Sequence, residues 1–60
     1  MKHKIIVKVT YQFDPIILEV EAFRWRENGD LELFDGGKYW RFPYNVLESV
    51  YMEVIENERP

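Results

Sequence analysis

The stretch Ile16–Phe42, IILEVEAFRWRENGDLELFDGGKYWRF, decides the fold of this 60-residue chain. Val, Ile, Leu and aromatic residues dominate it, and β-branched and aromatic residues favour β-strands. Asn28-Gly29 predicts a two-residue type I′ turn, because both central residues of that turn need a positive φ. Gly36-Gly37 predicts a second tight turn. The stretch is therefore expected to form a three-stranded antiparallel meander, with strands at 16–26, 31–35 and 38–42.

The predicted strand at 16–26 has a change of character along its length. Its first half alternates apolar and acidic residues, but the apolar face ends in Arg24 and Arg26. Either the strand leaves the core at that point, or a bulge exchanges the two faces and buries Phe23 and Trp25.

The segment before Asp14-Pro15 predicts another strand, at 4–11. Apolar and polar residues alternate there, and the side chains expected to face the core are Ile5, Val7, Val9 and Tyr11. Pro15 marks the break, because proline has no N–H to donate to a sheet. If this strand pairs with the last one, its lysines meet the acidic residues of the C-terminal segment.

Two interpretations fit the C-terminal segment. Asn45 and Glu48 have the spacing of a helix capping box, and the apolar residues that follow share a helical stripe, which predicts a helix at 45–56. The density of β-branched residues instead predicts a turn at 43–47 followed by a strand at 49–55. We favour the strand, because the rest of the chain is β-rich.

The predicted fold class is all-β, with one small domain over residues 1–60 and a frayed tail at 57–60. The layout of five short antiparallel strands, tight turns and a proline-containing turn before the last strand resembles that of SH3-like and Sm-like barrels. The resemblance implies a partly open five-stranded barrel. The helix interpretation gives the alternative, an α+β domain in which one C-terminal helix at 45–56 covers a four-stranded antiparallel sheet.

Composition excludes several classes of protein. The chain has no cysteine, which rules out disulfides and thiolate metal sites. Its 47% hydrophobic and 17% aromatic content is that of a folded protein, and its apolar runs are too short to span a membrane. We expect an acidic cytoplasmic protein that uses no membrane, metal or cofactor.

Catalysis is not expected from these residues. One serine, one threonine and one histidine, His3, are too few to build a nucleophile with its base. An acid–base pair of carboxylates could be formed by two of the three residues Glu19, Glu21 and Glu32. Such a pair, however, needs a cleft that excludes water. We interpret these carboxylates as a solvated acidic face.

Aromatic and basic residues alternate in two parts of the meander. Stacking aromatics flanked by basic residues are typical of surfaces that bind single-stranded nucleic acid. The candidate phosphate contacts are Arg24, Arg26, Lys38 and Arg41. The net charge of −3 argues against this function, because phosphate neutralisation supplies much of the affinity.

A surplus of large apolar side chains instead indicates a protein-binding module. The candidate contact residues are Phe23, Trp25, Phe34, Tyr39 and Tyr44, since tyrosine and tryptophan dominate binding energies at interfaces. Open sheet edges and apolar residues on outer faces also predict a homodimer.

The chain resembles, in style, the small orphan proteins of bacteriophages and prophages. The features that carry this resemblance are Trp25 before Asn28-Gly29, then Leu31-Glu32-Leu33, and the closing run 50–54, VYMEV. The resemblance implies an inhibitor or accessory protein that blocks a host enzyme or defence system by binding it. A structural component of a larger assembly is the other function in this class.

Overall fold

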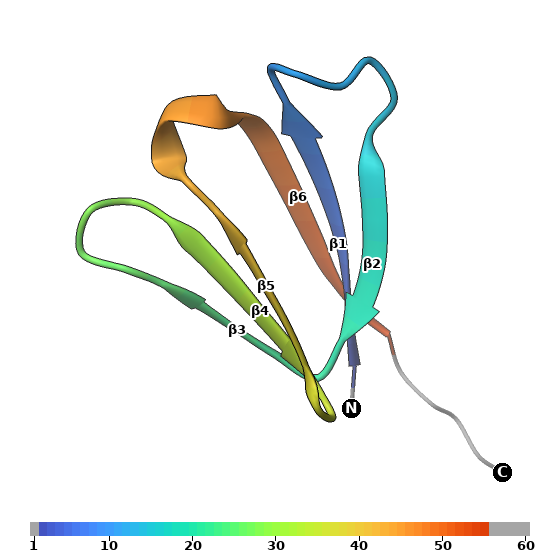
Figure 1. Ribbon diagram of the computed structural model, residues 1–60. Coiled ribbons are helices and arrows are strands. Elements are labelled where there is room, and N and C mark those ends of the chain that lie inside the picture. The colour runs from blue at the N-terminus through green and yellow to red at the C-terminus, as the bar shows by residue number, and fades with distance from the viewer. Residues whose placement is uncertain (1, 56–60) are drawn as a thin grey trace, which may run out of the picture.

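The computed structural model describes residues 2–55, so the predicted frayed tail at 57–60 lies outside the described residues. These described residues form six strands and one short 3-10 helix (Figure 1): β1 (Lys2–Val9), β2 (Ile16–Val20), β3 (Ala22–Trp25), β4 (Leu31–Asp35), β5 (Lys38–Phe42), η1 (Tyr44–Val46) and β6 (Leu47–Ile55). The prediction of an all-β chain is confirmed. The C-terminal segment is a strand, and the alternative helix at 45–56 is wrong. Among residues 2–55, no helix has the length and apolar character needed to cross a bilayer.

The strands form two three-stranded antiparallel sheets, ordered β2-β1-β6 and β3-β4-β5. The sheets converge where β2 passes into β3 and splay apart toward the opposite end (Figure 1). At the converging end, Lys2 Nζ lies 3.5 Å from Asp35 Oδ1 and joins β1 to β4. Among the described residues the two sheets do not close on each other, so the expected partly open five-stranded barrel is not confirmed.

The count of six strands instead of five comes from a bend at Glu21. The predicted strand at 16–26 is divided there into β2 and β3, which belong to different sheets. The Glu21 N–H donates a 3.1 Å hydrogen bond to the Phe34 carbonyl, which ties the bend to the end of β4. Only the second half of the predicted strand, β3, therefore belongs to the meander with β4 and β5, while the first half, β2, pairs with β1.

The bend also changes which side of the chain faces the core, as in one of the two predicted alternatives. Val20 is buried at the end of β2, and Phe23 becomes the residue of β3 that packs against the core. The same alternative predicted that Trp25 is buried as well, and this is wrong, because Trp25 is 48% exposed. Trp25 ends the edge strand of its sheet and has only β4 beside it.

The core lies between the two sheets and takes residues from four strands. The buried apolar residues are Ile5, Val7, Val9, Val20, Leu31, Leu33 and Phe42. Tyr11 was expected to join them and instead is exposed, because β1 ends at Val9. The chain turns at residues 10–11, where the Thr10 N–H donates to the Val46 carbonyl at 2.9 Å.

The turn between β3 and β4 differs from the predicted type I′ turn. Gly29 has a φ of +96°, but no non-glycine residue within 2–55 has a positive φ, so Asn28 does not adopt the conformation that the type I′ turn requires. The Gly29 N–H donates to the Arg26 carbonyl at 3.0 Å, and the Arg26 N–H donates to the Asp30 carbonyl at 2.8 Å. These bonds define a three-residue loop in which a type I turn is followed by a left-handed glycine.

The extra loop residue sets the register of the hairpin. A two-residue loop at Asn28-Gly29 would place Trp25 opposite Glu32, whereas the observed register places Arg24 opposite Glu32. A one-residue change of register moves every side chain to a new partner and the other face. The loop length therefore decides which charged groups meet on this sheet.

Candidate functional site

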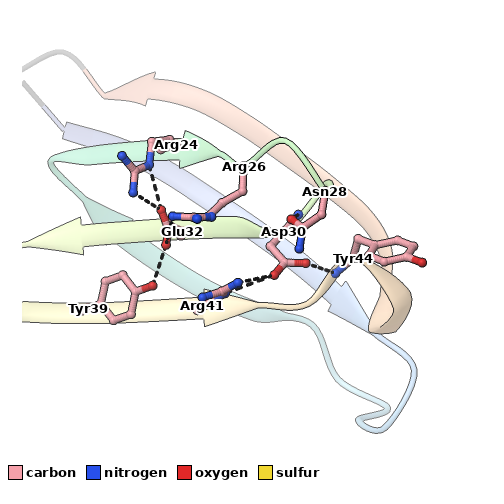
Figure 2. A network of polar contacts seen from close by, with 8 residues as sticks. All are labelled: Arg24, Arg26, Asn28, Asp30, Glu32, Tyr39, Arg41 and Tyr44. Atoms are coloured by element: carbon pink, nitrogen blue, oxygen red, sulfur yellow. Dashed lines mark hydrogen bonds and ion pairs between the residues drawn. The ribbon is translucent and has the colours of Figure 1, made fainter.

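The outer face of the β3-β4-β5 sheet carries a row of charged residues. Arg24, Glu32 and Arg41 are direct cross-strand neighbours, so all three project from the same face. The next row on that face contains Phe34 and Tyr39. We call this surface the arginine–tyrosine face and define it by Arg24, Arg26, Asp30, Glu32, Phe34, Tyr39 and Arg41. Figure 2 shows all of these side chains except Phe34.

Glu32 lies at the centre of this face, and its side chain is only 3% exposed. Its Oε1 accepts from Arg24, at 2.8 Å from Nε and 2.7 Å from Nη2. Its Oε2 accepts from the Tyr39 hydroxyl at 2.7 Å and lies 3.5 Å from Arg26 Nη1. A buried carboxylate needs such partners, because removing a charge from water without them is strongly unfavourable.

Asp30 forms a second centre at the end of the same face. Its Oδ2 accepts from Arg41, at 3.1 Å from Nε and 2.8 Å from Nη2. Its Oδ1 accepts from the Tyr44 backbone N–H at 2.8 Å, and its own N–H donates to Asn28 Oδ1 at 3.0 Å. The carboxylate thereby joins the β3–β4 loop to the start of η1.

Both carboxylates are held in their ionised form. The hydrogen bond from Arg41 and the Tyr44 N–H lower the pKa of Asp30 below its ordinary value. The Tyr39 hydroxyl and then Arg24 lower the pKa of Glu32. In return, the same hydrogen bond raises the pKa of Tyr39, because Glu32 favours its protonated phenol. At neutral pH the face thus holds three guanidinium groups against two carboxylates and keeps one excess positive charge.

Aromatic rings border the charged rows. The Phe34 and Tyr39 rings lie 5.4 Å apart, tilted by 47°, and the Arg24 guanidinium lies 6.0 Å from the Phe34 ring centroid. Tyr39 is 52% exposed, so it remains accessible while its hydroxyl is bound to Glu32. An open depression beside the face is lined by residues 24–28 of β3 and its loop.

The other candidate contact residues are not all on this face. Phe23 packs toward the core and meets His3 edge-to-face at 5.2 Å between ring centroids. Trp25 lies on the opposite face of β3 but reaches the open depression. Tyr44 is 60% exposed at the Asp30 end of the network (Figure 2). Lys38 lies opposite Asp35 at the start of β5, and the alternation along this strand places it on the other face from Arg41.

The interpretation of Glu32 as part of a solvated acidic face is wrong. Glu19 lies on the other sheet, opposite Lys4, and Glu32 is buried among arginines and a tyrosine. Sequence reasoning also assigned no role to Asp30. The cause was the loop length, because Asn28-Gly29 predicted a two-residue turn, whereas the observed three-residue loop at 27–29 places Glu32 opposite Arg24.

Within residues 2–55, no three histidine, aspartate or glutamate side chains are grouped so as to hold a metal ion. The comparisons with known proteins find no match. Neither the family models nor the curated proteins nor the solved structures give a match to this chain. What the face can do chemically therefore follows from its own groups: it presents fixed guanidinium donors and an exposed phenol ring to anything that docks on the sheet.

Proposed function

We propose that the chain is a non-enzymatic protein-binding module and that the arginine–tyrosine face is its contact surface. The observation that supports this is the pair of buried carboxylates, which hold three arginines and a tyrosine on an exposed sheet face. Arginine and tyrosine are among the residues that dominate interface energies. Side chains that are ordered before binding lose less conformational entropy when the partner arrives.

The partner is a cytoplasmic host protein, and the chain acts on it as an inhibitor or accessory protein of the phage type. The basis of this part of the proposal is the sequence resemblance and the absence of cysteine. We also group the fold with the SH3-like barrels, with β2 and β3 counted as one long strand bent at Glu21 and η1 placed before the last strand.

The test is capture of a binding partner from bacterial lysate with the full chain as bait, with and without nuclease. We expect one stoichiometric protein that survives nuclease treatment and is lost when Arg24→Ala or Tyr39→Ala replaces the wild type. The matched control is Phe13→Ala, a substitution at an 89% exposed residue of the β1–β2 loop that should leave capture unchanged. Loss of capture with the control alone would place the contact elsewhere.

Capture also separates the two protein-binding roles. An enzyme or defence protein that loses activity in the purified complex supports the inhibitor role. A capsid, tail or other particle protein supports an assembly component instead. Retention of no protein at all, by a bait that is folded by circular dichroism, would contradict the proposal.

Single-stranded nucleic acid is the second candidate ligand, and the Phe34–Tyr39 ring pair beside Arg24 favours it. Ring stacking and nearby guanidinium groups suit exposed bases and phosphates. Against it, Glu32 and Asp30 already occupy donors of the three arginines. Fluorescence anisotropy with labelled DNA and RNA oligonucleotides at low salt tests it. Salt-dependent binding that Lys38→Ala or Arg41→Ala weakens would support it.

A further inference from the structure

β6 is an edge strand of unusual length for this small fold. It spans nine residues, whereas the other edge strands β2, β3 and β5 span five, four and five. Among residues 2–55 its only ladder partner is β1. Proteins protect edge strands with charged side chains (above all lysine), proline, bulges or short length, and the only charged side chains of β6 are Glu48 and Glu53. Leu47–Ile55 contains neither lysine nor proline, and its one register shift, where Val9 pairs with Leu47, leaves 49–55 regular.

An exposed apolar row leads across the sheet to this edge. Ile6 of β1 pairs with Ile17 of β2 on one side and with Tyr51 of β6 on the other. Ile17 is 56% and Tyr51 57% exposed, although both are large apolar side chains. The row therefore ends at the middle of β6, at the unpaired edge.

We propose that β6 pairs antiparallel with β6 of a second copy, about a two-fold axis at Tyr51. Side chains alternate between the two faces of a strand, so odd-numbered residues of β6 share one face and even-numbered residues the other. The inner faces of the two copies therefore join only in a register that pairs odd with odd and even with even residue numbers. Centring the axis on Tyr51 joins the two apolar rows end to end. It also places Glu53 opposite the partner's Ser49 and Val50 opposite the partner's Met52.

Charge is compatible with this register, as it is with the face-matched register centred on Val50, so the apolar row that ends at Tyr51 decides between them. A shift by one residue, with the axis between Val50 and Tyr51, would set Glu48 opposite the partner's Glu53 and would mismatch the faces as well. Like charges directly opposite each other are unfavourable in a sheet. The Tyr51-centred register avoids every carboxylate–carboxylate pair within 48–54 and merges two three-stranded sheets into one of six strands.

This surface is separate from the arginine–tyrosine face, so the dimer and the proposed function can fail independently. Pairing at β6 hydrogen-bonds an edge that a chain of this size has few other means to protect. Dimerisation also stabilises each copy by mass action. A concentration-dependent melting temperature is therefore expected.

The first test measures mass against concentration by sedimentation equilibrium and traps the interface by cysteine cross-linking. Because the native chain has no cysteine, Tyr51→Cys introduces a single thiol at the two-fold axis. We expect a dimer in solution and rapid disulfide formation by Tyr51→Cys under mild oxidation. Ile17→Cys, at the opposite end of the same row, is the matched control and should cross-link slowly. A monomer at all concentrations, or faster cross-linking by Ile17→Cys, would overturn the proposal.

The second test uses charge and leaves the monomer intact. Ser49→Glu places a new carboxylate opposite Lys8 within each copy, which is favourable there, but opposite Glu53 of the partner in the dimer. Two such contacts per dimer should weaken association by about tenfold. Adding Glu53→Gln should restore it. An unchanged dissociation constant for Ser49→Glu, in a variant with wild-type circular dichroism, would also reject the register.

Discussion

The Tyr39 hydroxyl donates a 2.7 Å hydrogen bond to Oε2 of Glu32, diagonally across the β4–β5 ladder. The acceptor is a buried carboxylate, and the donor belongs to a half-exposed ring. This bond is the leading cause of the lowered pKa of Glu32 and of the raised pKa of Tyr39. It therefore links the charged centre of the sheet to the aromatic surface that we propose as the contact site.

Removing that hydrogen bond should destabilise the fold. Tyr39→Phe keeps the ring but leaves Oε2 of Glu32 with only the 3.5 Å contact to Arg26. We expect urea unfolding at neutral pH to give a lower free energy of unfolding. We also expect NMR titration to show that the pKa of Glu32 moves back toward its ordinary value. Tyr11→Phe, in the exposed β1–β2 loop, is the control and should change neither quantity.

Acid should weaken the fold through both buried carboxyls. The pKa values of Asp30 and Glu32 are lower in the folded chain than the ordinary values, so the unfolded chain binds protons first as the pH falls. Their contribution to stability is complete above the ordinary carboxyl range, about pH 4, and is lost as the pH falls through the lower folded values. Stability measured from pH 7 to pH 2 should decline accordingly.

The double variant Asp30→Asn/Glu32→Gln isolates this contribution. It should be less stable than the wild type at pH 7 and should show a shallower decline in acid. Glu48→Gln, an exposed carboxyl outside the network, serves as the control. Parallel stability curves for the double variant and the wild type would mean that the network does not control the acid response.

Alanine substitutions at two glycines should distinguish backbone strain in the folded chain from lost conformational freedom in the unfolded chain. Gly29 has a φ of +96°, and an added Cβ would lie 3.1 Å from Tyr44 Cβ, so Gly29→Ala should lower the free energy of unfolding by about 1–2 kcal/mol. Gly37 lies outside the left-handed region with open space around it. Gly37→Ala should be neutral or stabilise by up to about 1 kcal/mol, because it restricts the unfolded chain. Equal effects of the two variants in thermal or urea unfolding would contradict this account.

A core truncation should test how narrow the stability margin is. Leu33 is fully buried, and Leu33→Ala should remove about 2–5 kcal/mol. A chain of this length has a total stability of about 3–9 kcal/mol, so the variant should be largely unfolded or melt near room temperature by circular dichroism. Ile17→Ala is the control, because its side chain lies on the outer face. A cooperative melt at the wild-type temperature for Leu33→Ala would show that the core does not depend on this residue.

Local sequence patterns predicted most of the strands. Alternation placed Ile5, Val7 and Val9 in the core, and Gly36-Gly37 correctly marked the turn between strands at 31–35 and 38–42. β-branched density correctly favoured a strand over a helix in the last segment. These signals act within a few residues, so the sequence alone reveals them.

The candidate site was harder to predict because it depends on register. The Asn28-Gly29 pair predicted a two-residue turn. The third loop residue shifts the register by one, so each side chain of β3 faces a different residue of β4 from the one predicted. Burial of Glu32 needs one arginine from β3, another from the residue after β3, and a tyrosine from β5 to reach the same carboxylate. No local propensity encodes that coincidence. The bend at Glu21 was equally hidden, since its anchor is the Phe34 carbonyl of another strand.

The pairing of β1 with β6 also determines how the chain must fold. β3, β4 and β5 join through short hairpins, but Lys2 finds its partner at Ile55, nearly the whole described chain away. Contacts this distant are entropically demanding to close, so folding is expected on the order of milliseconds to seconds rather than microseconds. On the ribosome, β1 and its core residues emerge before β6 and remain without this neighbour until β6 has been synthesised. Throughout that interval one edge of β1 is unpaired, which makes the nascent chain most vulnerable to misassociation before β6 pairs with it.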